Sequence, residues 1–297
     1  MRIEKLAPEF DDLIDSDNKI EEITHDMVFT EGPVWNSKTQ SLIFSDIPSN
    51  KIFTWTASNG VQIFRKDSNF SNGLTYNPQG ELIACEHKSR SVTRTVNNCE
   101  IQAVATHFHS KKLNSPNDVI SAQDGSILFT DPIYGLNAGM GGPAEMELDF
   151  EGVFLCRPGS DPVKPQLVTD SFERPNGLAF SPDESLLYIA DTVRQHIRVF
   201  HVEDGWKFSG GQVWAELWDD EYCGRPDGMK VDNKGNLFTT GPGGVWVFNP
   251  QAELLGRIYL PDKTSNLAWG EDGHSLFITS SAKVYMIHCK TKGEILI

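Results

Sequence analysis

The chain has 297 residues and a net charge of −15, which comes from 26 basic and 41 acidic side chains. This excess of acid argues against a surface that binds nucleic acid or an anionic membrane, because such surfaces cluster lysine and arginine. Most of the acidity is typical of a solvated surface, and a smaller part would suit a pocket that attracts cations. We therefore expect neither nucleic acid nor a membrane as a partner.

The cysteines and the N-terminus favour a cytoplasmic protein. The five cysteines are Cys85, Cys99, Cys156, Cys223 and Cys289. Their odd number and the lack of a CxxC pair indicate reduced, mostly buried thiols, and neither a disulfide framework nor a zinc knuckle. The first 20 residues are rich in acid and contain no apolar segment of signal-peptide length. No window of the sequence approaches the ~20 apolar residues of a membrane span.

One pattern occurs six times along the chain. Each copy starts with a polar residue and a short apolar run, passes a glycine-containing turn, and reaches a second apolar run 10 or 11 residues after the polar one. The six polar residues are Glu31, Asn72, Asn117, Asn176, Asp227 and Ser265. Repetition at a spacing of about 40–60 residues is typical of radially repeated β-sheet folds. The sequence therefore predicts an all-β, six-bladed propeller with four-stranded blades, in a single domain over residues 1–297.

Short β-branched and aromatic runs between turn residues predict the four strands of each blade. In the first repeat these runs cover residues 31–35, 41–46, 50–56 and 61–66. The third strands of the later repeats are predicted at 91–96, 152–157, 196–202, 244–250 and 283–288. Helix is expected to be minor, because no segment keeps a 3.6-residue period over 12 positions.

Two segments stand outside the simple repeat. Residues 20–26 stand in front of Glu31 in the same way that the last strand of the first repeat stands in front of Asn72. The N-terminal segment 1–28 is therefore expected to supply an outer strand that pairs with the last blade. The alternative is that residues 293–297 supply this strand. Residues 135–150 form a glycine-rich insertion after the second strand of the third repeat. Long loops in compact domains are usually functional or disordered, so we expect a lid or pocket wall.

The six polar residues should recur at one place in space, at the ends of the innermost strands and around the central channel. As an alternative, the Asn-Gly and Asp-Gly pairs among them could be simple turn residues. Glu31 and Asn117 share this register without belonging to an Asn-Gly or Asp-Gly pair, which favours a common site. Two carboxylates and two amides form a hard-oxygen set that suits Ca²⁺, Mg²⁺ or Mn²⁺ better than a tetrahedral structural zinc.

Five motifs resemble those of the gluconolactonase/regucalcin (senescence marker protein) family. They are TEGPVW from Thr30, LNSPNDV from Leu113, FTDPIYG from Phe129, RPNGLAFSPD from Arg174 and GRPDGMKVD from Gly224. The resemblance covers residues 25–290 and is strongest to the microbial gluconolactonases. It implies a six-bladed propeller with one divalent metal ion, for which Ca²⁺ is the first choice and Mg²⁺, Mn²⁺ and Zn²⁺ are alternatives. The implied ligands are Glu31, Asn117, Asn176 and Asp227.

Other residues near these positions are candidate substrate contacts. The second strand of each repeat returns to the end where the first began, which places Glu86 and His87 beside Asn72. Asn72 shares the register of the ligands without being one of the family's usual ligands, so it is expected to bind substrate or a metal-bound water. Ser115 stands where animal regucalcins carry an arginine, and Tyr134 could line the pocket. The alternative for Glu86 and His87 is a structural cluster at the rim, and for Tyr134 it is ordinary packing.

The function implied by the resemblance is hydrolysis of a sugar lactone to an aldonic acid, with D-glucono-1,5-lactone as the reference substrate. In the family's mechanism Asp227 would serve both as a ligand and as the general base. The absence of a GxSxG motif disfavours a serine esterase. Two alternatives remain: a phosphotriesterase on a related propeller, and a noncatalytic metal-binding propeller.

Overall fold

The computed structural model describes residues 1–97, 100–162, 164–295 and 297. The chain forms two compact units. The first unit contains residues 1–30 and 177–295, and the second contains residues 31–176 together with the C-terminal end. The expectation of a single domain over residues 1–297 stays a prediction.

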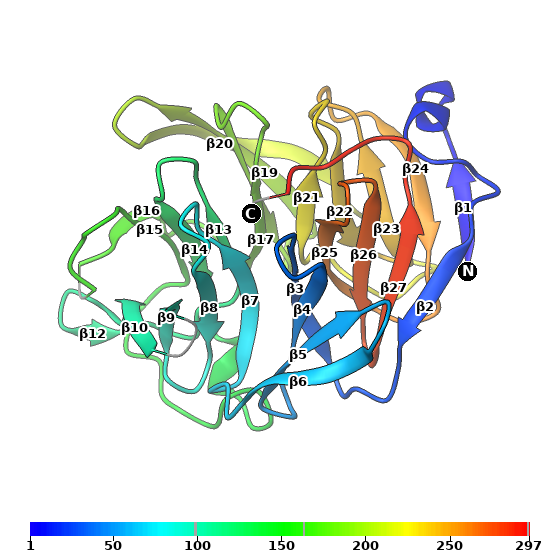
Figure 1. Ribbon diagram of the computed structural model, residues 1–297. Helices are drawn as coiled ribbons and strands as arrows, with labels where there is room; N and C mark the ends of the chain where they lie inside the picture. Colours follow the sequence, from blue (N-terminus) through cyan, green and yellow to red (C-terminus); the bar gives the residue numbers. More distant parts are fainter. Residues whose placement is uncertain (98–99, 163, 296) are drawn as a thin grey trace. The chain divides into compact units, whose positions relative to one another are not determined.

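Three four-stranded sheets follow one another in the second unit (Figure 1). The first consists of β3 (Thr30–Asn36), β4 (Ser41–Asp46), β5 (Lys51–Thr56) and β6 (Gly60–Lys66). The second consists of β7 (Ser71–Tyr76), β8 (Leu82–Glu86), β9 (Ser91–Val96) and β10 (Glu100–Ala105). The third consists of β13 (Val119–Ser121), β14 (Ile127–Asp131), β15 (Gly152–Cys156) and β16 (Gln166–Thr169). A small hairpin, β11 (His107–Phe108) and β12 (Lys111–Lys112), and a 3₁₀ turn, η2 (Tyr134–Leu136), complete this unit.

The first unit contains the other three sheets (Figure 1). One consists of β17 (Pro175–Phe180), β18 (Leu186–Asp191), β19 (His196–Glu203) and β20 (Lys207–Glu216). The next consists of β21 (Met229–Val231), β22 (Leu237–Gly241), β23 (Gly244–Phe248), β24 (Leu254–Tyr259) and β1 (Arg2–Lys5). The last consists of β25 (Thr264–Gly270), β26 (Ser275–Ser280), β27 (Lys283–His288) and β2 (Ile20–Thr24). The 3₁₀ turn η1 (Pro8–Asp12) lies between β1 and β2.

The strands agree with the predicted ranges, usually within one or two residues. The fifth strand of the sheet β21–β24 was not expected. In that sheet β1 pairs antiparallel with β24, with Arg2 opposite Tyr259. Only four residues long, β1 is too short to show a recognisable alternation in the sequence.

The outer position of the last sheet is filled by β2, in which Ile20 lies opposite Ile287 of β27. The C-terminal segment takes a different place, because Gly293 forms an isolated bridge with Asp232. Burial of apolar side chains favours the pairing of β2 with β27. Ile20 and Ile287 both belong to one hydrophobic cluster together with Phe10, Leu13 and Ile14.

The glycines that follow the repeated polar residues are required by close packing of neighbouring innermost strands. The Gly73 N–H donates to the Asn117 carbonyl at 2.8 Å, and the Gly177 N–H donates to the Asp227 carbonyl at 3.1 Å. A Cβ atom would lie 2.6 Å from the Asn117 oxygen if added at Gly73, and 2.1 Å from the Asp227 oxygen if added at Gly177. Both glycines lie inside strands. The alternative that these Asn-Gly pairs are turns is therefore wrong.

Four of the cysteines are described, and all four are free thiols. Cys85, Cys156 and Cys289 are buried and Cys223 is exposed, while Cys99 lies outside the described residues. Burial raises the pKa of Cys156 to about 12. Among the described residues no helix is long and apolar enough to cross a membrane.

Candidate functional site

The repeated polar residues lie at or just before the beginning of the innermost strand of each sheet, as the repeat pattern predicted. In the second unit Glu31, Asn72, Asn117 and Asn176 are all at most 5% exposed. Asp227, in the first unit, is half-buried. Burial of this many polar side chains requires hydrogen bonds or bound groups to offset the loss of water.

Three of these residues come from β3, β17 and the segment before β13. The Glu31 Oε2 atom accepts the N–H of Gly32 at 2.9 Å. The backbone of Asn117 is fixed on both sides, because its N–H donates to the Thr130 carbonyl and its own carbonyl accepts from Gly73, each at 2.8 Å. Asn176 is the second residue of β17 and is 3% exposed.

The backbone around Asp227 is held at three points. Its N–H donates to Thr240 Oγ1 at 3.0 Å, its carbonyl accepts from Gly177, and the preceding Pro226 carbonyl accepts from Thr192 Oγ1 at 2.8 Å. This support fixes the position from which the carboxylate extends. The sixth polar residue, Ser265, donates to the Thr30 carbonyl at 2.7 Å and so has a structural partner.

The donor types at these positions fit a hard cation. Among the described residues no three His, Cys, Asp or Glu side chains lie close enough together to hold a metal. The predicted set would not form such a group, since two of its four members are asparagines. One buried oxygen in the same register, Oδ1 of Asn72, has no hydrogen-bond partner in the structure. Buried amide oxygens normally accept a hydrogen bond, so this atom is a candidate contact for a bound group.

Asn72 and His87 are in contact. Nδ2 of Asn72 lies 3.3 Å from Nε2 of His87, and Nδ1 of His87 lies 2.6 Å from the carbonyl oxygen of Met140. Burial lowers the pKa of His87 to about 4, so the imidazole is neutral at neutral pH. The sequence placed His87 beside Asn72, and the structure brings the two together.

Glu86 is engaged within its own sheet. Its carboxylate accepts hydrogen bonds from Asn69 Nδ2 at 2.9 Å, Ser89 Oγ at 2.7 Å and Thr93 Oγ1 at 2.8 Å. These bonds use both oxygens and satisfy a buried charge. They support the structural alternative for Glu86, and its role as a substrate contact stays a prediction.

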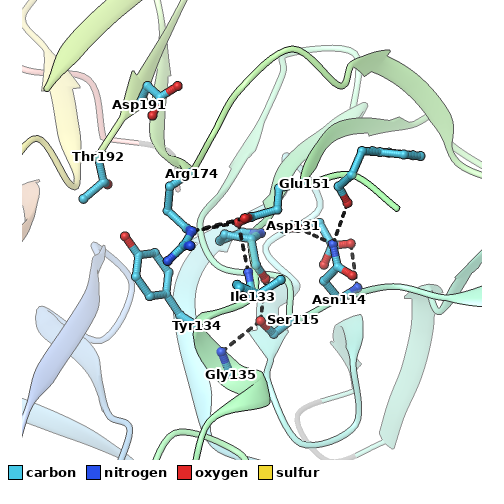
Figure 2. A network of polar contacts seen from close by, with 12 residues as sticks. Asn114, Ser115, Asp131, Ile133, Tyr134, Gly135, Glu151, Arg174, Asp191 and Thr192 are labelled. Carbon is cyan, nitrogen blue, oxygen red and sulfur yellow. Dashed lines mark hydrogen bonds and ion pairs between the residues drawn. The ribbon is translucent and has the colours of Figure 1, made fainter. Parts of the chain in front are cut away.

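Ser115 holds the turn that carries Tyr134 (Figure 2). Its hydroxyl donates to the Pro132 carbonyl at 2.5 Å and accepts the N–H of Gly135 at 2.9 Å. The neighbouring Asn114 donates from Nδ2 to the carbonyl oxygens of Asp131 and Phe150, at 3.0 and 2.9 Å. The segment 113–116 is therefore bonded to both ends of the insertion 135–150.

The insertion itself is anchored at several points. Glu147 forms an ion pair with Arg90 at 3.0 Å and accepts the backbone N–H of Lys112 at 2.9 Å. Leu148 is 3% exposed and belongs to the core cluster of the second and third sheets. Leu148 therefore packs in the sheet core, where burial of its side chain is favourable, and is not part of an exposed lid surface.

An arginine–glutamate pair that no sequence pattern predicted lies beside Tyr134 (Figure 2). Arg174 Nε lies 2.9 Å from Oε2 of Glu151, and the guanidinium carbon lies 5.0 Å from the centre of the Tyr134 ring. Oε2 of Glu151 also accepts the backbone N–H of Ile133 at 3.2 Å. The motif around Arg174 was recognised, but Glu151 is 23 residues away in sequence and carries no motif of its own.

Asp131, at the end of β14, is fully buried. Burial raises the pKa of its carboxyl to about 8, against the opposing effect of hydrogen bonds from the backbone of Asn114 and Ser115. The N–H of Asn114 donates to Oδ2 of Asp131 at 2.7 Å. Near neutral pH this side chain therefore carries a proton in a large part of the molecules.

Residues 29–282 match the sequence family described as SMP-30/Gluconolactonase/LRE-like region. The chain belongs to this family. A gluconolactonase of Zymomonas mobilis is 33% identical over 98% of this chain and 87% of that protein, and a pentonolactonase of Haloferax volcanii is 27% identical over 84% of this chain and 81% of that protein. The solved structure of a gluconolactonase from Xanthomonas campestris is 31% identical, covers 97% of this chain and 95% of its own, and superimposes with a TM-score of 0.90. The expected fold class, an all-β, six-bladed propeller with four-stranded blades, is confirmed.

Proposed function

We propose that this protein hydrolyses an aldonolactone to an aldonic acid with the help of one divalent metal ion. The protein is an enzyme of the lactone-hydrolysing class, as the gluconolactonase and the pentonolactonase among its relatives indicate. Metal dependence is proposed because oxygen donors recur at or just before the start of the innermost strands. The donors in this register are Glu31, Asn117, Asn176 and Asp227.

These four side chains would hold the metal, and Ca²⁺ is the proposed ion because it prefers several oxygen ligands. A divalent cation in such a site polarises a carbonyl oxygen and stabilises the charge that develops on it during hydrolysis. The two carboxylates balance the two positive charges of the metal ion, and the two amides are neutral. The site as a whole would therefore carry no net charge and could be buried.

Asp227 is the proposed general base. Its backbone is fixed by Thr240 and Gly177, so the carboxylate works from a defined position. It would take one proton from the attacking water while the oxygen bonds to the carbonyl carbon. The bond between that carbon and the ring oxygen then breaks, and the ring oxygen would take up the proton that Asp227 accepted, to become a hydroxyl group.

The substrate side of the proposed site lies in the second and third sheets. Asn72 presents a buried amide oxygen without a partner, and Tyr134 stands under the Arg174 guanidinium. Ser115 would contribute by holding the turn that carries Tyr134, and His87 by holding the side chain of Asn72. Glu86 would contribute through its strand, β8. The proposed partner is a small sugar lactone, and the proposed location of the protein is the cytoplasm.

The deciding experiment is acid release from a panel of aldonolactones, with D-glucono-1,5-lactone as reference. The metal-free protein prepared with EDTA is the control, and Ca²⁺, Mg²⁺, Mn²⁺ and Zn²⁺ are added back in separate arms. Turnover that disappears with EDTA and returns with a metal supports the proposal. An organophosphate arm tests the phosphotriesterase alternative. Hydrolysis of the phosphotriester without any lactone turnover would refute the lactonase assignment, and metal binding with no turnover would favour a noncatalytic propeller.

A further inference from the structure

The insertion 135–150 closes over one buried histidine. His87 is 1% exposed, with Nδ1 2.6 Å from the Met140 carbonyl oxygen and Nε2 3.3 Å from Nδ2 of Asn72. The single imidazole therefore connects the insertion to a side chain in the register of the proposed ligands. All three residues belong to the second unit.

The contacts fix which nitrogen of His87 carries the proton. A backbone carbonyl can only accept, so the Nδ1 atom that faces Met140 must be the donor. In a neutral imidazole the other nitrogen, Nε2, is then an acceptor. Asn72 must therefore turn its NH₂ group toward His87. This assigns the orientation of the Asn72 amide, because the hydrogen-bond network decides which end of an amide faces a given partner.

The amide oxygen of Asn72 consequently faces away from His87. In the structure it is buried and has no hydrogen-bond partner. Rotating the amide to satisfy this oxygen would break the bond to Nε2 and place two acceptors opposite each other. An unpaired buried acceptor is costly, so the arrangement is suited to a donor that arrives with a ligand.

Two glycines let the insertion reach the imidazole. A Cβ atom added at Gly135 would lie 2.4 Å from Cγ of His87, and one added at Gly141 would lie 2.9 Å from Cβ of His87. Both distances are too short for any side chain. At these two positions glycine is therefore needed to make room for the buried histidine.

We propose that His87 is a positioning residue that holds Asn72 with its Oδ1 atom as the acceptor for a hydroxyl group of the sugar lactone. A sugar hydroxyl can donate a hydrogen bond to this oxygen. A carbonyl, an ether oxygen or a carboxylate cannot, because each of them only accepts. A site that is built to bond a hydroxyl group rejects analogues that lack it. This inference rests on the proposed lactonase function and adds a specificity element to it.

Two variants of His87 separate its two contacts. In His87→Asn the side-chain amide nitrogen can replace Nδ1 and keep the bond to Met140, but nothing reaches Asn72. In His87→Gln the amide oxygen can replace Nε2 and keep the bond to Asn72, while the Met140 contact is lost. Both variants retain the Cβ and Cγ atoms that pack against Gly135 and Gly141. Each would be compared with Asn72→Ala and with the double variant of Asn72→Ala and His87→Asn.

For D-glucono-1,5-lactone, we expect His87→Asn and Asn72→Ala each to lose about five- to tenfold in kcat/KM, the value of one hydrogen bond. His87→Gln should stay within about twofold of the wild type, and the double variant should lose no more than Asn72→Ala alone. A series of monodeoxy lactones, each lacking one hydroxyl group, would also be tested. With the lactone that lacks the hydroxyl bound by Asn72, the wild type and Asn72→Ala should be equally slow. Calcium affinity, measured by calorimetry, should be the same in all variants.

Several results would overturn the proposal. Loss of activity in His87→Gln with none in His87→Asn would show that the histidine acts by anchoring the insertion. Additive losses in the double variant would show that His87 and Asn72 act independently. Weaker calcium binding by Asn72→Ala would make Asn72 a metal ligand. The hydroxyl contact would be excluded if, for every deoxy lactone, the loss in kcat/KM relative to the full lactone were the same in the wild type and in Asn72→Ala.

A measurement without turnover tests the same arrangement. The ¹⁵N NMR spectrum of the histidine side chains should show a protonated Nδ1 and an unprotonated Nε2 for His87, assigned by its disappearance in His87→Gln. A protonated Nε2 would refute the orientation of Asn72. If the wild type hydrolyses no lactone, the proposed function fails, and the NMR result still decides whether His87 orients the amide.

Discussion

The carboxylate of Glu151 joins Arg174 to the turn that carries Tyr134. Arg174 Nε lies 2.9 Å from Oε2 of Glu151, and the same oxygen accepts the backbone N–H of Ile133 at 3.2 Å. The guanidinium of Arg174 at the same time covers the Tyr134 ring. One acidic side chain therefore sets the relative position of a cation and an aromatic ring beside the proposed substrate site.

Glu151→Gln should therefore impair substrate binding more than the chemical step. The amide keeps the shape but loses the charge that holds Arg174, a bond worth about 1.5–3 kcal/mol for charged groups. We expect KM for lactone to rise about tenfold with little change in kcat, measured by steady-state kinetics. Glu173→Gln, a change at the exposed neighbour of Arg174, is the control. Equal effects of the two substitutions would show that the pair has no special role.

Asp227→Ala should abolish turnover while the fold remains intact. Loss of a general base alone lowers kcat by about 10²–10⁴-fold. Asp227 is half-buried and lies outside the strands, so the free energy of unfolding should change by less than about 1 kcal/mol. Lactone kinetics and urea unfolding would be measured on the same preparation, with Asp204→Ala in an exposed turn as control. Residual turnover within tenfold of the wild type would contradict the assignment.

Removal of the metal should stop turnover without unfolding the protein. The sheets are stabilised by buried apolar clusters such as the one containing Phe129 and Phe154, and these do not depend on a metal. Calcium at 100 times its dissociation constant should raise the free energy of unfolding by about 2.7 kcal/mol, seen as a higher Tm. A chelated protein that is unfolded at room temperature would show that the metal is structural.

Asp131 should make stability fall as the pH rises. Folding raises the pKa of this carboxyl from about 4 to about 8. Between these values the folded state binds a proton that the unfolded state has lost, so stability decreases with increasing pH in this window and levels off above it.

Asp131→Asn removes this titration and keeps an acceptor for the N–H of Asn114. Urea unfolding from pH 4 to pH 9 should show a stability difference between variant and wild type that grows in favour of the variant up to about pH 8. The same change at the exposed Asp124 serves as control. Parallel pH profiles for wild type and Asp131→Asn would contradict the raised pKa.

The insertion should contribute to stability through Leu148. This side chain is 3% exposed, whereas the nearby Met146 is 40% exposed. Leu148→Ala should therefore cost about 2–5 kcal/mol of the free energy of unfolding, and Met146→Ala less than about 0.5 kcal/mol. Urea unfolding of both variants checks the difference. A small effect at Leu148 would mean that the insertion packs more loosely than the structure shows.

The sequence by itself determined the six sheets and most strand ranges. Alternating apolar residues and turn residues specify strands locally, so the repeat from Glu31 to Ser265 was readable without coordinates. The shared register of the polar residues was readable for the same reason. The motif resemblance named the family that the comparisons established.

The tertiary structure alone decided how individual side chains are used. Gly73 and Gly177 looked like turn residues, and only the approach of the neighbouring strand shows why they are glycines. Glu86 and His87 are adjacent in sequence, yet one is engaged within its sheet and the other orients Asn72. Such contacts join residues that are far apart in the sequence, 57 positions between Arg90 and Glu147 and 235 between Ser265 and Thr30. Local sequence patterns carry no information about which distant atoms will meet.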